Sequence, residues 1–521
     1  MEYYLAGALL RGAQVVADAA IWVACGCFIA AIFRYMMGAE KTRSLFGNNG
    51  RFGLLIGWGI GMLLPVCSLG VIPVVRELYR ARVKPGTIVA FGLTAPLFNP
   101  MSILYGLSLS DPFAVVVFSA ATMVIVTGLG ALWGHFFCRD YVSLHSQAQA
   151  TEGDDVLLAD SVPTSGSRRS VAVLYAASTE MVGKTAFYMF IGVLCSVLIS
   201  VLVPHGSLQN KTEPDNIFAP AFMAFYVTPV YSTPLLAMSQ IGGMFQHGNS
   251  VGAAFALLVL GAGVNIGLLA WLGSAFGVRR LVSFLVLAFA LTIGLAYAMD
   301  KPLYPAGVIP AGHTHAFDVY THPYHFGQPG LLATAQAKAK EYVGSGRQAG
   351  VLLLVGLAVI GLVFRVIEWR WDLQKWFHVA PTSKSSLEIV VPSWVTGLVA
   401  ATGLIIASIA GTFMYYPDTE TALGDLSPIS GNCVLAAKTK DWEGFEKWVV
   451  ICDDLSRRLE VGVYLRNGSV SEFKRAKAKF YREKLNEIRD DINVGQTSRI
   501  EDQAIELHTA YLQMSRAFRE E

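Results

Sequence analysis

Charged residues are scarce in this chain. Only 15% of its 521 residues are Asp, Glu, Lys or Arg, whereas 54% are hydrophobic, and an ordinary soluble domain has about a quarter of charged residues. The formal net charge is +2, and no basic patch with interleaved aromatic residues occurs, so the sequence does not indicate a nucleic-acid-binding protein. This composition argues against a soluble globular protein and favours one that is embedded in a lipid bilayer.

Sequence motifs of enzymes and of cysteine-based metal sites are also missing. The seven cysteines include no C-x-x-C pair, which argues against a zinc ribbon or a thioredoxin-type centre. We find no nucleotide-binding glycine loop, no G-x-S-x-G elbow and no acid pair in a suitable site, so we predict that the chain is not an enzyme. The first apolar run lacks a preceding basic segment and a small-residue cleavage site, and we therefore interpret it as a retained membrane span.

Long apolar runs predict a multi-pass helical membrane protein, because about 20 apolar residues suffice to cross a bilayer. The clear candidates are residues 13–33, 112–137, 182–203, 249–273, 279–299, 347–367 and 393–415. Two other apolar regions, roughly 52–110 and 218–246, are interrupted by Pro, Gly and hydroxyl residues. Non-helical backbone at membrane depth is found where it is buried in protein or lines a cavity, so this pair of interruptions predicts a transport site.

The expected fold class is an all-α polytopic membrane protein with two re-entrant or broken-helix hairpins and a small helical C-terminal domain. We divide the chain into a first membrane half (1–138), a cytoplasmic linker (139–181), a second membrane half (182–299), a His-rich outer loop (300–346), two further spans (347–416) and a helical C-terminal domain (417–521). The broken hairpins occupy about 52–110 in the first half and about 218–246 in the second.

The positions of Lys and Arg predict that the two hairpins enter the membrane from opposite sides. Basic residues flank the first hairpin at both ends, near Arg43 and Arg80, and positive loops favour the cytoplasm. A hairpin that enters and returns to the cytoplasm satisfies both clusters. The second hairpin follows a segment near Asp215 that is not basic and suits the outside.

The spacing of Gly and Asn supports an inverted repeat. Gly86 precedes Asn99 by thirteen residues, and Gly252 precedes Asn265 by the same number. Each run is rich in small residues and carries its Asn at the interruption. An inverted-topology repeat is a common architecture of transporters.

Three short segments of the first interrupted region carry a specific pattern, namely Pro65–Arg76 (PVCSLGVIPVVR), Val83–Gly86 (VKPG) and Ala90–Pro100 (AFGLTAPLFNP). They resemble the Cys-Ser-Cys-Gly-Val-Ile-Pro motif, the basic turn and the Ala-Pro-x-x-Asn-Pro break of the predicted-permease family that includes the ArsP organoarsenical exporters. The resemblance is looser over 218–298. It implies a permease of the bacterial inner membrane that acts on a small solute.

Leu69 stands where that motif has its second cysteine. Trivalent arsenic is a soft ion that prefers thiolates, usually more than one. Cys67 alone cannot form a dithiolate, and Cys25 and Cys27 lie two positions apart on a predicted helix, where they point to different faces. The pattern therefore predicts a permease without predicting arsenical export.

The interrupted regions supply the candidate substrate contacts. They are Cys67, Ser68, Thr94, Asn99, Ser232, Thr233 and Asn265. Asn side chains offer both donors and an acceptor, and they could contact the solute, satisfy freed backbone groups or do both. Cys67 could equally be a packed small hydrophobe. Helix N-termini that follow the interruptions, near Val71 and Thr233, would favour an anionic or electron-rich group.

Further candidates lie outside the interruptions. Asp18 is the ionisable residue of the first span, and such residues are functional candidates. The outer loop contains His313, His315, Asp318, His322 and His325, a set that could bind zinc or copper or simply form a polar loop over the mouth. Trp442, Phe445, Trp448 and Val449 form an apolar stripe in the C-terminal domain. Cys433 and Cys452 in the same domain could form a disulfide.

The preferred interpretation is therefore an inner-membrane permease for a metalloid, a metal or a small anion, with the lipid bilayer and the solute as its partners. One alternative is a non-transporting membrane scaffold whose C-terminal domain, placed outside the cytoplasm, docks a protein partner. Another is a metal-handling protein that uses the His-rich outer loop.

Overall fold

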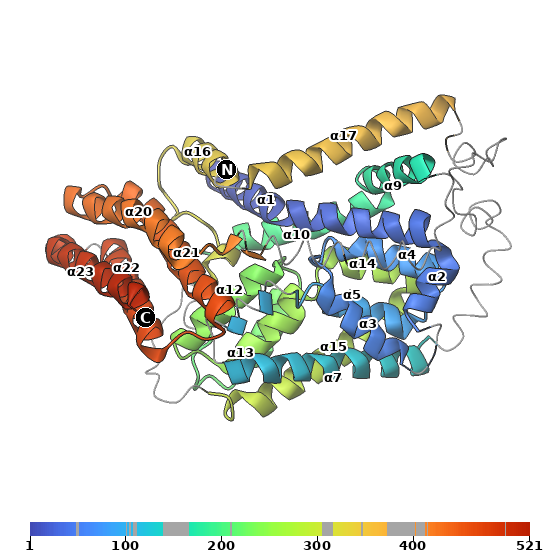
Figure 1. Cartoon of the computed structure of the whole chain (residues 1–521), viewed down its shortest axis with the longest axis horizontal. Helices are drawn as coiled ribbons and strands as arrows, with labels where there is room; N and C mark the ends of the chain where they lie inside the picture. Colours follow the sequence, from blue (N-terminus) through green and yellow to red (C-terminus); the bar gives the residue numbers. More distant parts are fainter. Residues whose placement is uncertain are drawn as a thin grey trace. The chain divides into compact units, whose positions relative to one another are not determined.

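The computed structural model describes residues 1–47, 52–99, 112–138, 166–208, 211–304, 316–344, 347–371, 415–494 and 496–520, together with a few isolated positions between these ranges. Every regular element in the described ranges is a helix (Figure 1). The chain separates into two compact units. The first comprises Met1–Ser102 and Val116–Ile405, and the second comprises Ile103–Val115 and Ile406–Glu521.

Five helices of the described chain are long and apolar enough to cross a membrane. They are Glu2–Leu45 (α1, Glu2–Ile32, continued by η1, Phe33–Met37, and α2, Gly38–Leu45), α7 (Pro112–Phe136), α10 (Lys184–Leu202), α15 (Val278–Asp300) and α17 (Gln348–Arg370). The prediction of a multi-pass helical membrane protein is confirmed. The first span is longer than predicted, and the predicted span 393–415 lies outside the described residues.

The predicted span 249–273 is not one straight helix. It consists of α13 (Val251–Ala256) with η2 (Leu257–Ala262) and of α14 (Ile266–Phe276), and the two parts are bent by 58°. The bend follows from Gly263 and from Asn265, whose side chain caps the first turn of α14. The predicted interruption at Asn265 is confirmed, and the bent pair together is long and apolar enough to be one span.

The two interrupted regions are built from short helices. The first contains α3 (Gly53–Leu63), α4 (Val71–Arg80) and α5 (Pro85–Thr94), and the second contains α11 (Ala219–Val227), α12 (Pro234–Gln246) and the bent pair. We call the non-helical segments between or after them break 1 (64–70), break 2 (95–99), break 3 (228–233) and break 4 (263–265). All four breaks are buried almost throughout.

Part of the predicted linker 139–181 is regular structure. Gly166–Glu180 forms α9, which packs against α1 and α17. The Tyr175 hydroxyl donates a hydrogen bond to Glu368 Oε1 at 2.7 Å. The polar composition of this stretch did not indicate a helix, although Ala172, Tyr175 and Ala176 of α9 are buried. Residues 139–165 lie outside the described part of the chain.

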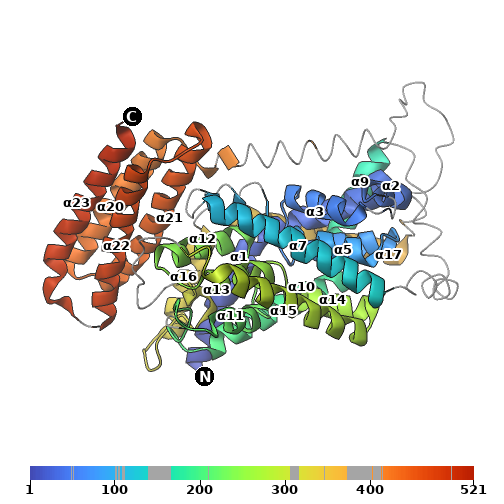
Figure 2. The ribbon, with the colours of Figure 1, turned by 90° about the horizontal axis from the view of Figure 1, so that it is seen from below.

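Helix α1 contacts several other helices of the first unit. It packs against α4, α9, α10, α17 and α16 (Leu331–Gly344), as the side-by-side ribbons in Figures 1 and 2 show. Helices α7 and α15 lie next to each other on another side, where Trp133 Nε1 donates to the Arg280 carbonyl at 2.8 Å. The breaks are enclosed by these longer helices.

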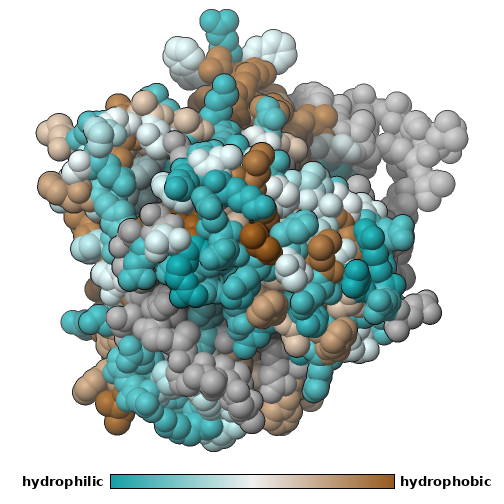
Figure 3. Space-filling view, turned by 90° about the vertical axis from the view of Figure 1, so that its left-hand side faces the viewer, coloured by the Kyte–Doolittle hydropathy of each residue, from teal (hydrophilic) through white to brown (hydrophobic). Residues whose placement is uncertain are grey.

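The second unit contains a bundle of four helices. They are α20 (Thr419–Thr439), α21 (Trp442–Asn467), α22 (Glu472–Val494) and α23 (Ile500–Arg519). Phe445 and Val449 are buried in its core, and Trp442 and Trp448 pack against that core, so the predicted stripe is confirmed. Figure 3 shows a face on which mainly hydrophilic side chains are exposed, with isolated hydrophobic ones.

Candidate functional site

Break 1 places a thiol and a hydroxyl inside the first unit. Cys67 and Ser68 are both fully buried. The Cys67 carbonyl accepts from the Val71 N–H at 2.8 Å, and its Sγ accepts from the Gly70 N–H at 3.3 Å. The Ser68 hydroxyl has no hydrogen-bond partner among the described residues.

Break 1 lies against the middle of the first span. A Cβ at Gly26 would overlap the Gly70 carbonyl oxygen, and a Cβ at Gly70 would overlap the Trp22 carbonyl oxygen. Glycine at both positions permits this backbone-to-backbone contact. Since Trp22 and Gly26 are near the middle of the 44-residue helix Glu2–Leu45, break 1 is far from both ends of that helix.

Breaks from the two halves meet around α10. A Cβ at Gly192 would lie 2.7 Å from Leu69 Cδ2 of break 1 and 3.0 Å from Asn265 Oδ1 of break 4. A Cβ at Gly263 of break 4 would lie 3.0 Å from Leu97 Cδ2 of break 2. Residues 64–70, 95–99 and 263–265 therefore converge, although up to 200 residues of chain separate them.

Break 3 joins the same cluster through Tyr231. Its backbone N–H donates to Ser196 Oγ of α10 at 3.1 Å. Its hydroxyl lies beside the Cys67 thiol and has no hydrogen-bond partner by geometry among the described residues. Sequence reasoning missed Tyr231, although its place between Pro229 and Pro234 in an interrupted helix was a usable signal.

The other two candidates of break 3 have local roles. Thr233 Oγ1 accepts from the Leu236 N–H at 3.1 Å and so caps α12, and the Ser232 hydroxyl donates to the Thr233 carbonyl at 3.2 Å. Thr94 similarly donates to the Ala90 carbonyl at 2.7 Å. These hydroxyls are already engaged within their own segments.

Asn99 and Asn265 use their side chains in the same way. Asn265 Oδ1 accepts from the Leu268 N–H at 2.9 Å, and Asn99 Oδ1 accepts from the Ser102 N–H at 2.7 Å. Both side chains are buried, and in both the Nδ2 group has no partner among the described residues. The oxygen of each Asn thus satisfies a freed backbone group, and its amide nitrogen is left as an unused buried donor.

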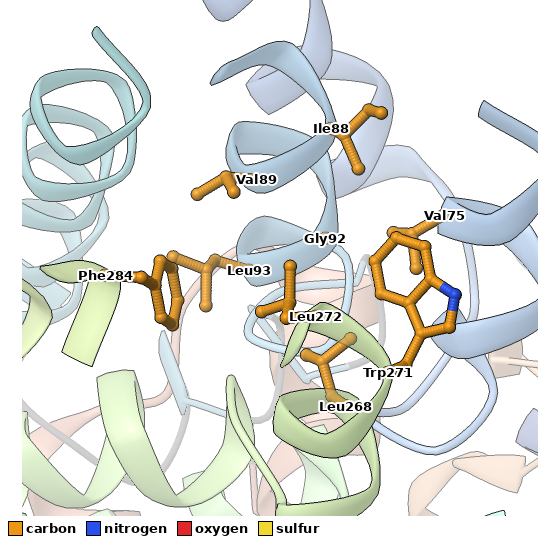
Figure 4. Close-up of a pocket in the computed structure, with 9 residues that line it drawn as sticks. All are labelled: Val75, Ile88, Val89, Gly92, Leu93, Leu268, Trp271, Leu272 and Phe284. Carbon is orange, nitrogen blue, oxygen red and sulfur yellow. The ribbon is translucent and has the colours of Figure 1, made fainter. Parts of the chain in front are cut away.

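A small apolar pocket of about 10 Å³ lies between α4 and α5 of the first half and α14 and α15 of the second. Figure 4 shows Val75 of α4, Leu93 of α5, Leu268 and Trp271 of α14 and Phe284 of α15 around it. Its walls lack charged and hydroxyl side chains, so it is unsuited to a polar solute. The breaks, by contrast, contain buried polar groups that have no hydrogen-bond partner in the described part of the chain, namely those of Ser68, Asn99, Tyr231 and Asn265.

Asp18 is engaged in an ion pair. Its Oδ1 accepts from Arg347 Nε at 2.8 Å, and its Oδ2 accepts from the Tyr342 hydroxyl at 2.8 Å. The Arg347 guanidinium also lies over the Tyr342 ring. Asp18 therefore fixes α16 and the start of α17 to α1.

The described part of the outer loop is held by hydrogen bonds to backbone groups. His322 Nδ1 lies 2.9 Å from the Tyr324 carbonyl oxygen and 3.1 Å from the Tyr324 nitrogen, its Nε2 faces the Tyr3 carbonyl at 3.2 Å, and its ring stacks on Tyr3. Burial lowers the pKa of His322, which favours the neutral ring. Arg11 Nε donates to the Thr321 carbonyl at 3.0 Å.

The predicted metal ligands are only partly covered by the structure. His313 and His315 lie outside the described residues. His325 lies beside His205, with ring centroids 4.7 Å apart. Among the described residues no group of three or more His, Cys, Asp or Glu side chains is arranged to hold a metal ion, and the zinc or copper site at His313, His315, Asp318, His322 and His325 stays a prediction.

The fold defines a class of protein: a multi-pass helical membrane protein whose interrupted helices meet inside its membrane unit. The chain belongs to the ArsP_1 family, described as a predicted permease, whose model matches residues 5–300. It is also 30% identical over 88 residues to the UPF0718 protein YcgR of Bacillus subtilis (strain 168). That match covers 17% of this chain and 30% of the relative. No solved structure matches the chain at a significant level.

Proposed function

We propose that this protein is a permease of the bacterial inner membrane that moves a small solute through a site formed by breaks 1 to 4. Membership of a predicted permease family supports the transport class. The site assignment rests on one observation, the convergence of the breaks at Gly192, where Leu69 and Asn265 both lie next to the same glycine. Irregular backbone at this depth requires such a protein-enclosed or cavity-lining position.

An inverted repeat would explain why the breaks come in pairs. Helices α3 and α11 begin at Gly53 and Ala219, α5 and α13 begin at Pro85 and Val251, and α7 and α15 begin at Pro112 and Val278. Each pair is 166 residues apart (219 − 53, 251 − 85 and 278 − 112). Asn99 and Asn265 have the same separation (265 − 99). The equal offsets support two halves that share one plan.

Close helix packing follows the same offset. A Cβ at Gly86 would overlap the Gly130 carbonyl oxygen, and a Cβ at Gly252 would lie 2.6 Å from the Ala296 carbonyl oxygen. These glycines and these carbonyls are again 166 residues apart (252 − 86 and 296 − 130). The α5–α7 contact in the first half thus corresponds to the α13–α15 contact in the second.

The test is solute flux in proteoliposomes with Asn99→Ala, Asn265→Ala and the double variant. We expect each single variant to lose most of the flux while it still inserts and purifies as a monodisperse protein. Asn216→Ala is the matched control, because Asn216 hydrogen-bonds only to a surface turn through the Lys211 carbonyl and the Phe218 N–H. Normal flux in both single variants would refute the site.

A further inference from the structure

We infer, on the basis of the proposed function, that the solute bound at the four breaks is a small anion rather than a metal cation. The first reason is the kind of buried group that has no partner. The Nδ2 groups of Asn99 and Asn265 can only donate, and the hydroxyls of Ser68 and Tyr231 can donate as well. A buried donor without an acceptor is costly, so these groups call for an acceptor-rich ligand.

The second reason is the direction of the helices that start at the breaks. Helix α4 begins at Val71 after break 1, α12 begins at Pro234 after break 3, and α14 begins at Ile266 after break 4. These helices have 10, 13 and 11 residues. The N-terminus of a helix carries partial positive charge, and this favours an anion nearby.

The third reason is that the breaks offer no carboxylate to a cation. The carbonyl oxygens at the ends of two preceding helices already accept hydrogen bonds. The Thr94 oxygen accepts from the Leu97 N–H at 2.9 Å, and the Val227 oxygen accepts from the Val230 N–H at 3.0 Å. Breaks 1 to 4 contain no Asp or Glu. Hard cations need several oxygen ligands, and a soft cation would find one thiol, Cys67, in break 1.

Exchange of Asn for Asp at the breaks distinguishes the two charge classes. Asp caps a helix as well as Asn does, so Asn265→Asp and Asn99→Asp keep the bond to the Leu268 or Ser102 N–H. Each variant replaces the unused donor with a negatively charged acceptor. For an anion this change removes a hydrogen bond and adds repulsion, whereas a cation would gain a ligand.

The experiment measures flux in proteoliposomes for phosphate, sulfate and selenite, for Zn²⁺, Cu⁺ and Na⁺, and for glycerol as a neutral solute. We expect the wild-type protein to move at least one of the anions, and we expect Asn265→Asp and Asn99→Asp to lower that flux at least tenfold. Asn216→Asp, in the surface turn, should leave it unchanged. Thermal unfolding of each purified variant confirms that the fold is kept.

The outcomes separate the two proposals. The wild-type protein could move a cation or glycerol but no anion, and Asn99→Ala and Asn265→Ala could abolish that flux. This result would overturn the anion inference and leave the permease proposal standing. Cation flux that Asn265→Asp increases would do the same. If the wild-type protein moves none of the solutes, both the inference and the proposed function are contradicted.

Discussion

Arg76 of α4 donates a hydrogen bond from Nη1 to Oε2 of Glu180, the last residue of α9, at 3.0 Å. The same nitrogen lies 2.7 Å from the Thr185 hydroxyl at the start of α10, and that hydroxyl also bonds to Glu180. The pair and its shared hydroxyl thus connect the first broken hairpin to α9 and to the start of α10 in the second half. The Glu180 side chain is only 8% exposed, and Arg76 compensates its buried charge.

Breaking this pair should destabilise the membrane unit. Removing one partner of a buried ion pair costs about 3–5 kcal/mol, because the other charge stays buried without compensation. We expect Arg76→Gln and Glu180→Gln each to lower the thermal unfolding midpoint, with a smaller change in the double variant than the two single changes would add up to. Arg279→Gln, at an exposed position, is the control and should leave the midpoint unchanged.

The unfolding midpoints of five purified proteins are compared: the wild type, the two single variants, the double variant and the control. Strictly additive losses in the double variant would show that Arg76 and Glu180 do not stabilise each other. Flux measured on the same samples then reports whether the connection between the halves is also needed for transport.

A methyl group at Gly26 should disrupt the contact between α1 and break 1. The added Cβ would overlap the Gly70 carbonyl oxygen, a backbone atom that cannot swing away. Overpacking of this kind typically costs about 1–3 kcal/mol and shifts backbone. We expect Gly26→Ala to lose flux and to unfold at lower temperature.

The matched control for Gly26→Ala is Gly59→Ala. Gly59 lies in α3, and a Cβ there would meet nothing within 4 Å. Alanine favours a helix over glycine by about 1 kcal/mol, so this variant should be at least as stable as the wild-type protein. Equal behaviour of the two variants would contradict the close approach of α1 and break 1.

Some of this arrangement could be predicted from the sequence, and some could not. Residue types that interrupt helices can be recognised in the sequence. Pro65, Asn99 and Asn265 therefore indicated the interruptions and the equal spacing in the two halves. Partners distant in sequence are not visible, so the sequence suggested neither Glu180 as the partner of Arg76, 104 residues away, nor Tyr231 as the neighbour of Cys67. A single sequence does not show which helix faces pack against each other in the folded chain.

Helix α9 was missed for a related reason. Its 15 residues are polar on average, and composition therefore suggested a mobile linker. The helix is stabilised by packing of a narrow buried face, which includes Ala172 and Tyr175, against neighbours that only the folded chain brings together.

Acidification should weaken the attachment of the outer loop. Burial lowers the pKa of His322 below its ordinary value, so the charged form of the ring is favoured when the loop detaches and the ring reaches solvent. The nearby groups include Arg11 of α1 and His205, and both would repel an added positive charge. Because the unfolded state takes up the proton more readily, His322 contributes its full stabilisation above about pH 6.5, and this contribution is lost as the pH falls further.

The measurement is limited proteolysis of the purified protein between pH 7.5 and 5.5, with cleavage sites mapped in residues 316–344. We expect cleavage there to increase at low pH in the wild-type protein, and His322→Asn should be cleaved to a similar extent at both pH values. His508→Asn, at an exposed position of α23, should behave like the wild-type protein. Cleavage that does not change with pH in the wild-type protein would show that His322 does not titrate in this range.

The thiols of Cys433 and Cys452 should be convertible into a disulfide that joins α20 to α21. Both are buried and unlinked, and the two thiols lie next to each other. The neighbouring Cys433 thiol and then the Tyr481 hydroxyl lower the pKa of Cys452, whereas the neighbouring Cys452 thiol and burial raise the pKa of Cys433. Cys452 is therefore the thiol that ionises first and attacks an oxidant.

Treatment with a disulfide oxidant, such as oxidised glutathione, should give one intramolecular bond and two equivalents of reduced glutathione. Unfolding in the presence of a maleimide–polyethylene glycol reagent should then show two fewer reactive thiols, and the bundle should gain about 2–4 kcal/mol of stability. Cys433→Ser and Cys452→Ser should each prevent the change, and Cys195→Ser, a substitution in the membrane unit, should not. If oxidation leaves all seven thiols reactive, the two sulfurs are not placed to form the bond, and the bundle has no covalent link between α20 and α21.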